Sequence, residues 1–349
     1  MNGNTENHER GVFAELRPSV VIATHPNVEY VVQGVTTLLR QRGIEVHIIQ
    51  PDIAVDRIPD CHVVMPCSAF RCGESVMDAL PHLRGIAALA AGTESIDIPA
   101  ATRRRLPVAH APTPENVTSM AEATVMLILA ALYRLPESQE RFRSGWDRPR
   151  APYARMLSGK TLGLVGFGKI ARAVAERLSS WNVRLITYSP RAPQASLPAC
   201  VQKVDLESLL AQSDVISLHA AVTDDNRYII NARTLKLAKP GIVLVNTARG
   251  ALVDQMELLE HLQHDGSAYV ALDCFDPEPL PMDSPVRRLG KGILTPHIVG
   301  HTRETQESLI EQGVDNVMRI LNYEAPEFVR NPEVLEGWVR ASGRTRLAG

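Results

Sequence analysis

From residue 20 to residue 321, short β-branched runs alternate with segments whose apolar residues recur at helical spacing. The runs predict strands at residues 20–23, 46–49, 63–65, 85–91, 108–110, 161–165, 184–188, 214–219, 242–246, 268–273 and 292–295. The helical spacing predicts helices at 28–42, 74–80, 98–105, 116–135, 170–180, 255–265 and 303–321, with a loop at 145–155. Strands that are joined through helices run parallel, and helices cover both faces of such a sheet. The predicted fold class is therefore α/β.

The length of 349 residues exceeds the size at which one hydrophobic core usually stops growing. The alternation is interrupted by the long helix at 116–135 and the loop after it, and then it restarts. We therefore expect two α/β units of unequal size. Residues 1–11 and 340–349 are expected to be flexible tails.

Composition excludes several classes of partner. A formal net charge of −2 provides no overall basic field, so nucleic acid and anionic membranes are not expected to bind. The apolar helix at 116–135 is interpreted as a buried connecting helix, and the start of the chain lacks a segment like a signal peptide. The five cysteines are scattered, and Cys67 and Cys72 lack a second pair at zinc spacing. Free thiols, no metal site and a cytoplasmic location are predicted.

A strand, a glycine turn and a helix start follow one another at residues 160–171. Gly166 allows a tight turn, and Gly168 lets the backbone approach a pyrophosphate that the helix N-terminus would hold. Ala171 stands where a third glycine is common, and the helix that follows is apolar on one face. A dinucleotide site is predicted here, and the alternative is a turn with a purely structural role.

The next strand ends at Ser189, and Arg191 follows shortly after it. Folds that prefer NAD usually carry Asp or Glu at this place, where the carboxylate accepts from the ribose hydroxyls. Ser189 cannot repel a 2′-phosphate, and Arg191 offers a charged donor to one. The predicted cofactor is NADP or NAD, with a preference for NADP. The alternative for Arg191 is an ordinary solvated loop residue.

Three further segments end or follow predicted strands, and they carry Arg249, Glu278 and His297. Ligands of open α/β sheets bind outside the carboxyl ends of the strands, so these side chains are expected in one crevice. When a hydride adds to a carbonyl carbon, His297 as imidazolium can supply a proton to the carbonyl oxygen, and Glu278 would orient the ring and favour its charged form. Arg249 can bind a carboxylate and polarise the carbonyl. Each residue alone is weak evidence, and the combination behind a nucleotide turn is stronger.

The segments VGFGKIARAVAERL, NTARGALVD, ALDCFDPEP and TPHIVGHT resemble the D-isomer-specific 2-hydroxyacid dehydrogenase family, which includes glyoxylate/hydroxypyruvate reductases and phosphoglycerate dehydrogenases. The segments AGTESIDIPAATRR and TPENVTSMAEATVMLILA extend the similarity to about residues 63–332. The resemblance implies two Rossmann-like, doubly wound parallel-sheet domains. It also implies a discontinuous substrate domain at 12–115 plus 305–332, a dinucleotide-binding domain at 116–304, and a homodimer closed largely around the long helix.

The resemblance also implies roles for individual residues, beginning with Arg249, Glu278 and His297 as the catalytic set. Cofactor contacts would fall at Gly166, Gly168, Lys169, Ile170, His219, Thr247, Ala248, Asp273 and Gly300, with Ser189 and Arg191 at the ribose-selecting position. Substrate contacts would come from Arg249 and from the backbone at Ser68, Ala69 and Gly92.

Some residues depart from branches of the family. Cys67 stands where similar phosphoglycerate dehydrogenases carry an arginine, although Arg71 offers a substitute. Phe70 predicts a bulkier and more apolar pocket wall than the small residue common there. Glu278 differs from the Gln that formate dehydrogenases pair with their His.

The predicted function is hydride transfer between NAD(P)H and a small 2-oxo acid, which gives a D-2-hydroxy acid. One alternative is a nicotinamide-sensing binding protein similar to transcriptional corepressors that keep this fold. Another is a phosphite-type oxidoreductase on the same scaffold. The sequence does not name the acid or the physiological direction.

Overall fold

The computed structural model of the chain describes residues 17–145, 148–149, 151 and 153–346, with side chains described up to residue 340. The chain forms two compact units, Met1–Thr113 with Gln306–Gly349, and Pro114–Thr305. The first unit is thus built from both ends of the chain, and the expected tail at residues 1–11 lies outside the described residues.

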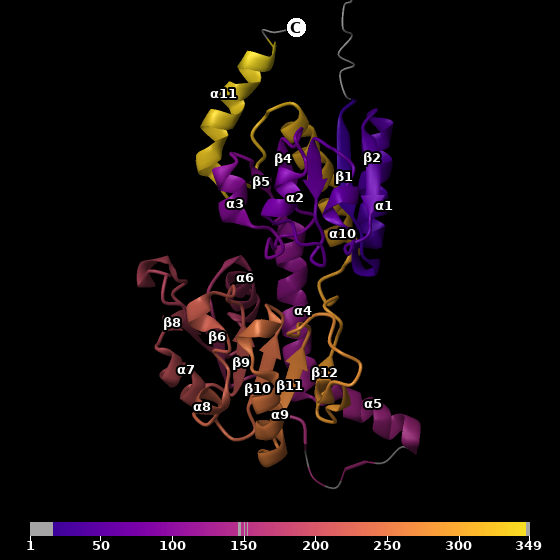
Figure 1. Cartoon of the computed structure of the whole chain (residues 1–349). Coiled ribbons are helices and arrows are strands. Elements are labelled where there is room, and N and C mark those ends of the chain that lie inside the picture. Colours follow the sequence, from indigo (N-terminus) through magenta and orange to yellow (C-terminus); the bar gives the residue numbers. More distant parts are fainter. Residues whose placement is uncertain (1–16, 146–147, 150, 152, 347–349) are drawn as a thin grey trace, which may run out of the picture. The chain divides into compact units, whose positions relative to one another are not determined.

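The first unit contains one sheet of five parallel strands in the order β2-β1-β3-β4-β5. Its strands are β1 Ser19–Ala23, β2 Glu45–Ile49, β3 Val63–Met65, β4 Gly85–Ala87 and β5 Val108–Ala109. Its helices are α1 Glu29–Gln41, α2 Glu74–Asp78, α3 Ile98–Arg103, α10 Arg303–Leu321 and α11 Leu335–Arg346. In Figure 1, the yellow helix α11 lies with the purple strands of this unit.

The pleat of β1 divides the core of this unit between two faces. Val20 and Ile22 pack with α1 and with the Val317 side of α10, whereas Val21 and Ala23 pack on the opposite face. All four strand side chains are 0% exposed. The continuous apolar run of β1 is therefore explained by burial on both sides of a parallel sheet.

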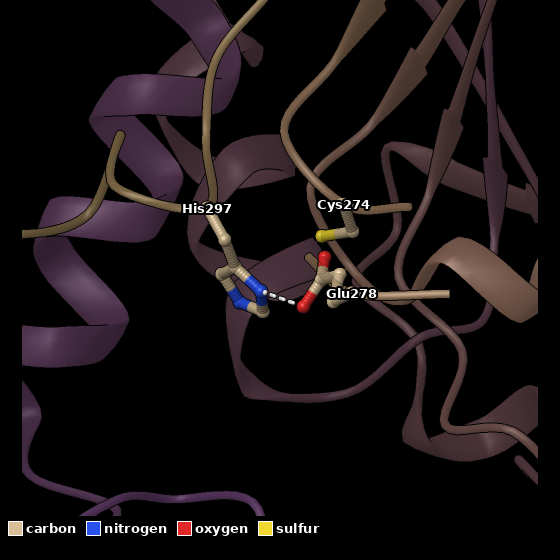
Figure 2. A group of neighbouring side chains, drawn as sticks. All are labelled: Cys274, Glu278 and His297. Carbon is tan, nitrogen blue, oxygen red and sulfur yellow. Dashed lines mark hydrogen bonds and ion pairs between the residues drawn. The ribbon is translucent and has the colours of Figure 1, made fainter. Parts of the chain in front are cut away.

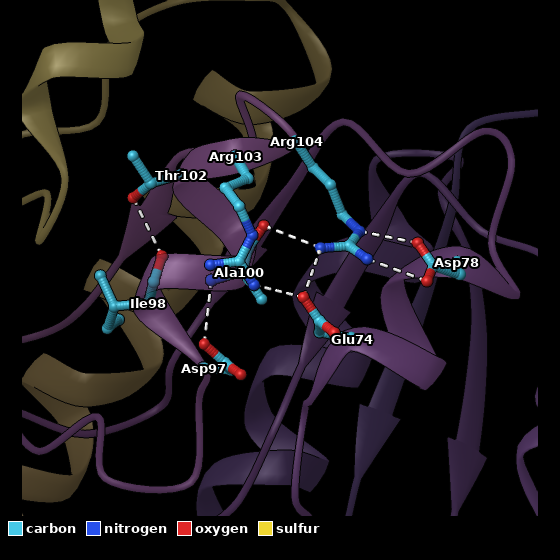
Figure 3. A network of polar contacts seen from close by, with 8 residues as sticks. All are labelled: Glu74, Asp78, Asp97, Ile98, Ala100, Thr102, Arg103 and Arg104. Atoms are coloured by element: carbon cyan, nitrogen blue, oxygen red, sulfur yellow. Dashed lines mark hydrogen bonds and ion pairs between the residues drawn. The ribbon is translucent and has the colours of Figure 1, made fainter.

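Charged side chains join α2 to α3 at the surface of the first unit. Arg104 donates from Nε to one carboxylate oxygen of Asp78 (2.7 Å) and from Nη2 to the other (2.8 Å), and both Arg103 and Arg104 pair with Glu74 (Figure 3). The Asp97 side chain caps the N-terminus of α3 by accepting from the amide of Ala100. Because these groups are exposed, solvent screens their charges, so the pairs orient α2 and α3 locally and add little to stability.

Helix α11 corrects one prediction, because the tail expected from residue 340 is helical as far as Arg346. The helix is held at its first turns, where the Trp338 indole N–H donates to the Arg84 carbonyl at 2.8 Å and the ring packs on Tyr323. Trp338 is 5% exposed. The polar residues from 340 onward continue this helix instead of forming a tail, because Trp338 attaches the preceding part of the helix to the first unit.

The second unit contains seven parallel strands in the order β12-β11-β10-β9-β6-β7-β8. They are β6 Thr161–Val165, β7 Arg184–Tyr188, β8 Val201–Lys203, β9 Val215–Leu218, β10 Val243–Asn246, β11 Tyr269–Leu272 and β12 Gly292–Leu294. The helices are α4 Pro114–Leu132, α5 Leu135–Ser144, α6 Lys169–Leu178, α7 Leu206–Gln212, α8 Ala232–Leu235 and α9 Gln255–His264. Figure 1 shows these strands side by side with helices on both faces.

Helix α4 is apolar and long enough to cross a membrane by length and composition, but it is a core helix. Leu127, Ile128 and Leu132 pack on the sheet beside α6, and each is at most 2% exposed. The interpretation of this segment as a buried helix is confirmed. The sequence did not predict α5 or β8, whose residues are mostly polar or exposed.

The α/β fold class with two parallel sheets is confirmed, as is the discontinuous first domain.

Candidate active site

The order of strands in the second unit reverses at β6, which lies between β7 and β9. At such a point the loops after two neighbouring strands leave in opposite directions and open a crevice at the carboxyl edge. Gly166 follows β6 with φ +89°, and a Cβ added there would lie 2.7 Å from the amide nitrogen of Ala220, after β9. Only glycine therefore permits the close approach of these two strand ends.

Gly168 is the N-cap of α6, and within the described part of the chain no side chain caps this helix start. A Cβ added at Gly168 would meet nothing within 4 Å, so the space beside this residue is open. Lys169 begins the helix and is exposed, and Ile170 is half-buried against the core. Uncapped amides and the positive end of the helix dipole suit a pyrophosphate, so these residues fit a dinucleotide.

The loop after β7 carries Ser189, which is half-buried, and Arg191, which is exposed. Lys203 of β8 donates from Nζ to the carbonyl of Ala192 at 2.6 Å and to that of Pro190 at 3.4 Å. These bonds hold the backbone on either side of Arg191. The sequence did not indicate Lys203, because its partners are backbone oxygens that no motif records.

Polar side chains make hydrogen bonds at the end of β9 and, separately, at the end of β10. His219 Nε2 lies 2.9 Å from the Ser217 hydroxyl, and burial lowers the pKa of His219 to about 4, so this ring is neutral at pH 7. Thr247 is buried, and its hydroxyl lies 3.1 Å from that of Thr124 on α4. The Ala248 amide donates to the Asn246 side chain at 3.0 Å. The bonds of Thr247 and Ala248 stabilise the loop that leads to Arg249.

Arg249 directly precedes the short 3-10 helix η5 (Gly250–Leu252). Its carbonyl accepts from the Asn246 side-chain amide at 2.8 Å, and its guanidinium donates to the Ala248 carbonyl at 2.7 Å. A Cβ added at Gly250 would lie 1.9 Å from the carbonyl of Phe275, so the backbone after β10 packs directly on the backbone after β11. This packing brings the Arg249 loop next to the segment that carries Glu278.

Glu278 and His297 form a hydrogen-bonded pair, with His297 Nδ1 2.9 Å from Glu278 Oε2 (Figure 2). The other carboxylate oxygen, Oε1, accepts from the Phe275 amide at 2.8 Å. The carboxylate is thus oriented from both sides. His297 has φ +56°, a left-handed conformation that costs free energy for a non-glycine residue and is maintained by its surroundings.

The pair shifts the titration of both groups. The hydrogen bond that His297 donates to Glu278 raises the pKa of His297 above its usual value. The charges of Glu278 and Asp273 raise this pKa further, whereas burial and the charge of Arg249 lower it. Burial raises the pKa of Glu278, but His297, the Phe275 amide and Arg249 together bring it below its usual value. The arrangement therefore favours an imidazolium beside a carboxylate, and the charge of Arg249 acts on both groups.

Asp273 stabilises the loop of His297. Its Oδ1 accepts from the Thr295 hydroxyl at 2.7 Å and from the amide of Ile298 at 3.0 Å, and the residue is 1% exposed. Gly300 is buried where an added Cβ would lie 2.2 Å from the Met120 sulfur on α4. Residues on both sides of His297 are thereby connected to the core of the second unit.

The predicted substrate-binding backbone lies in the first unit. Ser68 and Ala69 are exposed after β3, and Gly92 is half-buried beyond β4. Phe70 corrects a prediction, because its side chain is 3% exposed and packs in the core with Val76. The Phe70 ring was expected to form a pocket wall, but it is buried in the core between the sheet and α2.

Comparison with known proteins agrees with this geometry. Residues 125–299 match the sequence profile described as "D-isomer specific 2-hydroxyacid dehydrogenase, NAD binding domain". A glyoxylate reductase of Thermofilum pendens is 39% identical over 268 residues, which cover 75% of this chain and 78% of that protein. The chain belongs to the D-isomer specific 2-hydroxyacid dehydrogenase family. It is an oxidoreductase with an NAD(P)-binding domain.

Other relatives support the same assignment. A hydroxypyruvate reductase of Thermotoga maritima is 33% identical over 277 residues, covering 78% of this chain and 89% of that protein. Among solved structures, a protein of Thermus thermophilus superposes with a TM-score of 0.78 at 32% identity, covering 89% of this chain and 99% of that one.

Proposed function

We propose that this enzyme reduces a small 2-oxo acid, such as glyoxylate or hydroxypyruvate, to the D-2-hydroxy acid. The Nδ1–Oε2 hydrogen bond of 2.9 Å between His297 and Glu278 carries the proposal, because it prepares an imidazolium for proton donation. The names of the curated relatives support this substrate class.

In the proposed mechanism, the bound nicotinamide supplies the hydride, and the residues of the chain handle charge and protons. Arg249 binds the substrate carboxylate and stabilises the negative charge that develops on the carbonyl oxygen. His297 gives its Nε2 proton to that oxygen, while Nδ1 stays hydrogen-bonded to Glu278.

Steady-state assays with glyoxylate, hydroxypyruvate, pyruvate and phenylpyruvate test the proposal. We expect His297→Ala to lower kcat by at least about a hundredfold, the usual contribution of a general acid, and to leave cofactor binding nearly unchanged. His264→Ala on α9 is a matched control at an exposed histidine. Normal cofactor binding without turnover of any 2-oxo acid would contradict the proposal and favour a binding protein.

For the cofactor we propose a preference for NADPH, supported by Arg191 and by the absence of a carboxylate at Ser189. Arg191→Ala is expected to raise KM for NADPH by more than about tenfold, which corresponds to the loss of one charge-assisted bond, with little change for NADH. Arg184→Ala, at the opposite end of β7, is the matched control. A strong preference of the unchanged enzyme for NADH would contradict this proposal.

We also propose that the enzyme is a homodimer. Large apolar side chains remain exposed on α4, α5 and the turn between them, namely Met126 (53%), Tyr133 (50%), Leu135 (49%) and Phe142 (65%). Light scattering coupled to size-exclusion chromatography should give twice the mass of the chain. A monomer at micromolar concentration would contradict this.

A further inference from the structure

One cysteine lies beside the His297–Glu278 pair. Cys274 follows β11, is 2% exposed, and directs its sulfur toward the Glu278 carboxylate (Figure 2). One donor atom from each of the three residues lies within 4.8 Å of the other two. The side chains of Glu278 and His297 are 36% and 43% exposed, so the group is open to solvent on the side away from the sulfur.

A thiolate, an imidazole nitrogen and a carboxylate oxygen are the donor types that Zn²⁺ binds in proteins. In a tetrahedral site with ordinary bond lengths, such donors are separated by about 3.3–3.6 Å. The 2.9 Å between His297 and Glu278 must therefore open slightly, and the separations from the Cys274 sulfur, which are at most 4.8 Å, must close by no more than about 1.3 Å. Rotation of the side chains accomplishes this, and the open side leaves the fourth position to water.

We infer that Cys274, Glu278 and His297 form a binding site for Zn²⁺, and that its occupation stops catalysis. On binding, the thiol proton of Cys274 and the Nδ1 proton of His297 leave to solvent, and three bonds to the metal replace the hydrogen bond between His297 and Glu278. No oxidation or reduction occurs. The site revises the expectation of no metal centre, which considered only the spacing of cysteines along the chain.

The inhibitory effect rests on the proposed function, whereas the binding does not. With Nδ1 bound to the metal, His297 can release its Nε2 proton only by becoming an imidazolate. The ring then no longer alternates between imidazolium and neutral imidazole, and it cannot serve as the proton donor to a 2-oxo acid. Binding at this site therefore competes directly with catalysis.

Co²⁺ is a spectroscopic probe of the site, because a thiolate bound to Co²⁺ gives an intense near-ultraviolet charge-transfer band. We expect the purified full-length protein to develop this band with one equivalent of Co²⁺ per chain and to lose it on addition of Zn²⁺. Cys274→Ser keeps the side-chain volume and removes the thiolate, so its band should be absent. Cys200→Ala, which changes an exposed thiol, should keep the band.

Absence of the band in the unchanged protein overturns the inference, as does its persistence in Cys274→Ser or its loss in Cys200→Ala. Circular dichroism of each variant shows that the fold is retained.

The activity arm measures inhibition by Zn²⁺ as a fraction of each variant's own rate, followed by reversal with EDTA. Cys274→Ser should need more than about tenfold more Zn²⁺ than the unchanged enzyme, since even changes around the ligands cost that much affinity. A Co²⁺ band at Cys274 without turnover of any 2-oxo acid leaves this site intact and defeats the proposed function. Turnover of a 2-oxo acid without a Co²⁺ band overturns the metal site and leaves the proposed function intact.

Discussion

Replacing Asp273 with alanine tests how the loop of His297 is held. The carboxylate accepts from the Thr295 hydroxyl at 2.7 Å and from the Ile298 amide at 3.0 Å, and these two donors flank the histidine in the chain. Hydrogen bonds to a charged group contribute about 1.5–3 kcal/mol each, so the two bonds together are worth about 3–6 kcal/mol. Removing Asp273, 1% exposed, also removes the cost of burying its charge. We therefore expect a net loss of about 3 kcal/mol.

Urea denaturation followed by circular dichroism measures this loss as a shift in the unfolding of the second unit. Asp273→Asn keeps an acceptor oxygen of the same shape and should cost only about 1 kcal/mol. In the alanine variant kcat should also fall, because the segment from Thr295 to Ile298 no longer holds the imidazole against Glu278. If Asp273→Ala unfolds within about 0.5 kcal/mol of the unchanged protein, the reasoning is refuted.

Three further predictions concern pH, packing and the C-terminal helix. Because the pKa of His297 is raised, the rate of 2-oxo acid reduction should decline only as pH rises through a value above the pKa of an ordinary histidine. In Glu278→Gln this decline should move to lower pH, and an unchanged pH–rate profile would contradict the prediction. Gly250→Ala forces a Cβ against the Phe275 carbonyl and should cost about 3 kcal/mol or more in the same denaturation assay, with lower activity because the Glu278 segment is displaced. Trp338→Ala should cost about 3–5 kcal/mol and increase proteolysis within α11, and unchanged proteolysis would show that the indole is not its anchor.

The pairing of Glu278 with His297 has a consequence for stability as well as for catalysis. The raised pKa of His297 means that its contribution to folding is present below the ordinary histidine value and is lost as pH rises through the folded-state value. The lowered pKa of Glu278 means that its contribution is present above the ordinary carboxyl value and is lost as pH falls through the folded-state value. The His297–Glu278 pair therefore contributes most to stability at pH values between the ordinary carboxyl pKa and the ordinary histidine pKa.

Local features of the sequence predicted most of the scaffold. The β-branched run at β1 and the helical spacing of α10 were visible because strand and helix periodicities follow from backbone geometry alone. Elements without a strong pattern were missed, such as α5 and β8, since polar residues at the surface carry little periodic signal.

The candidate site, like the scaffold, was predicted from the sequence only in part. The order of glycine turn, Arg249, Glu278 and His297 along the strands predicted that these groups belong to one edge of a sheet. The sequence did not predict the support from Asp273 or the bonds from Lys203, because each joins segments that only folding brings together.

By itself, the sequence determined two parallel α/β sheets, a glycine turn suited to a dinucleotide and the residue types at the strand ends. Only the tertiary structure decided that Phe70 enters a core, that α11 is anchored through Trp338, and that the Cys274 sulfur lies beside the Glu278 carboxylate. The physical reason is the range of the forces involved. Turn and strand preferences act between neighbours in the chain, whereas burial, packing and the convergence of donor atoms depend on residues that are distant in sequence.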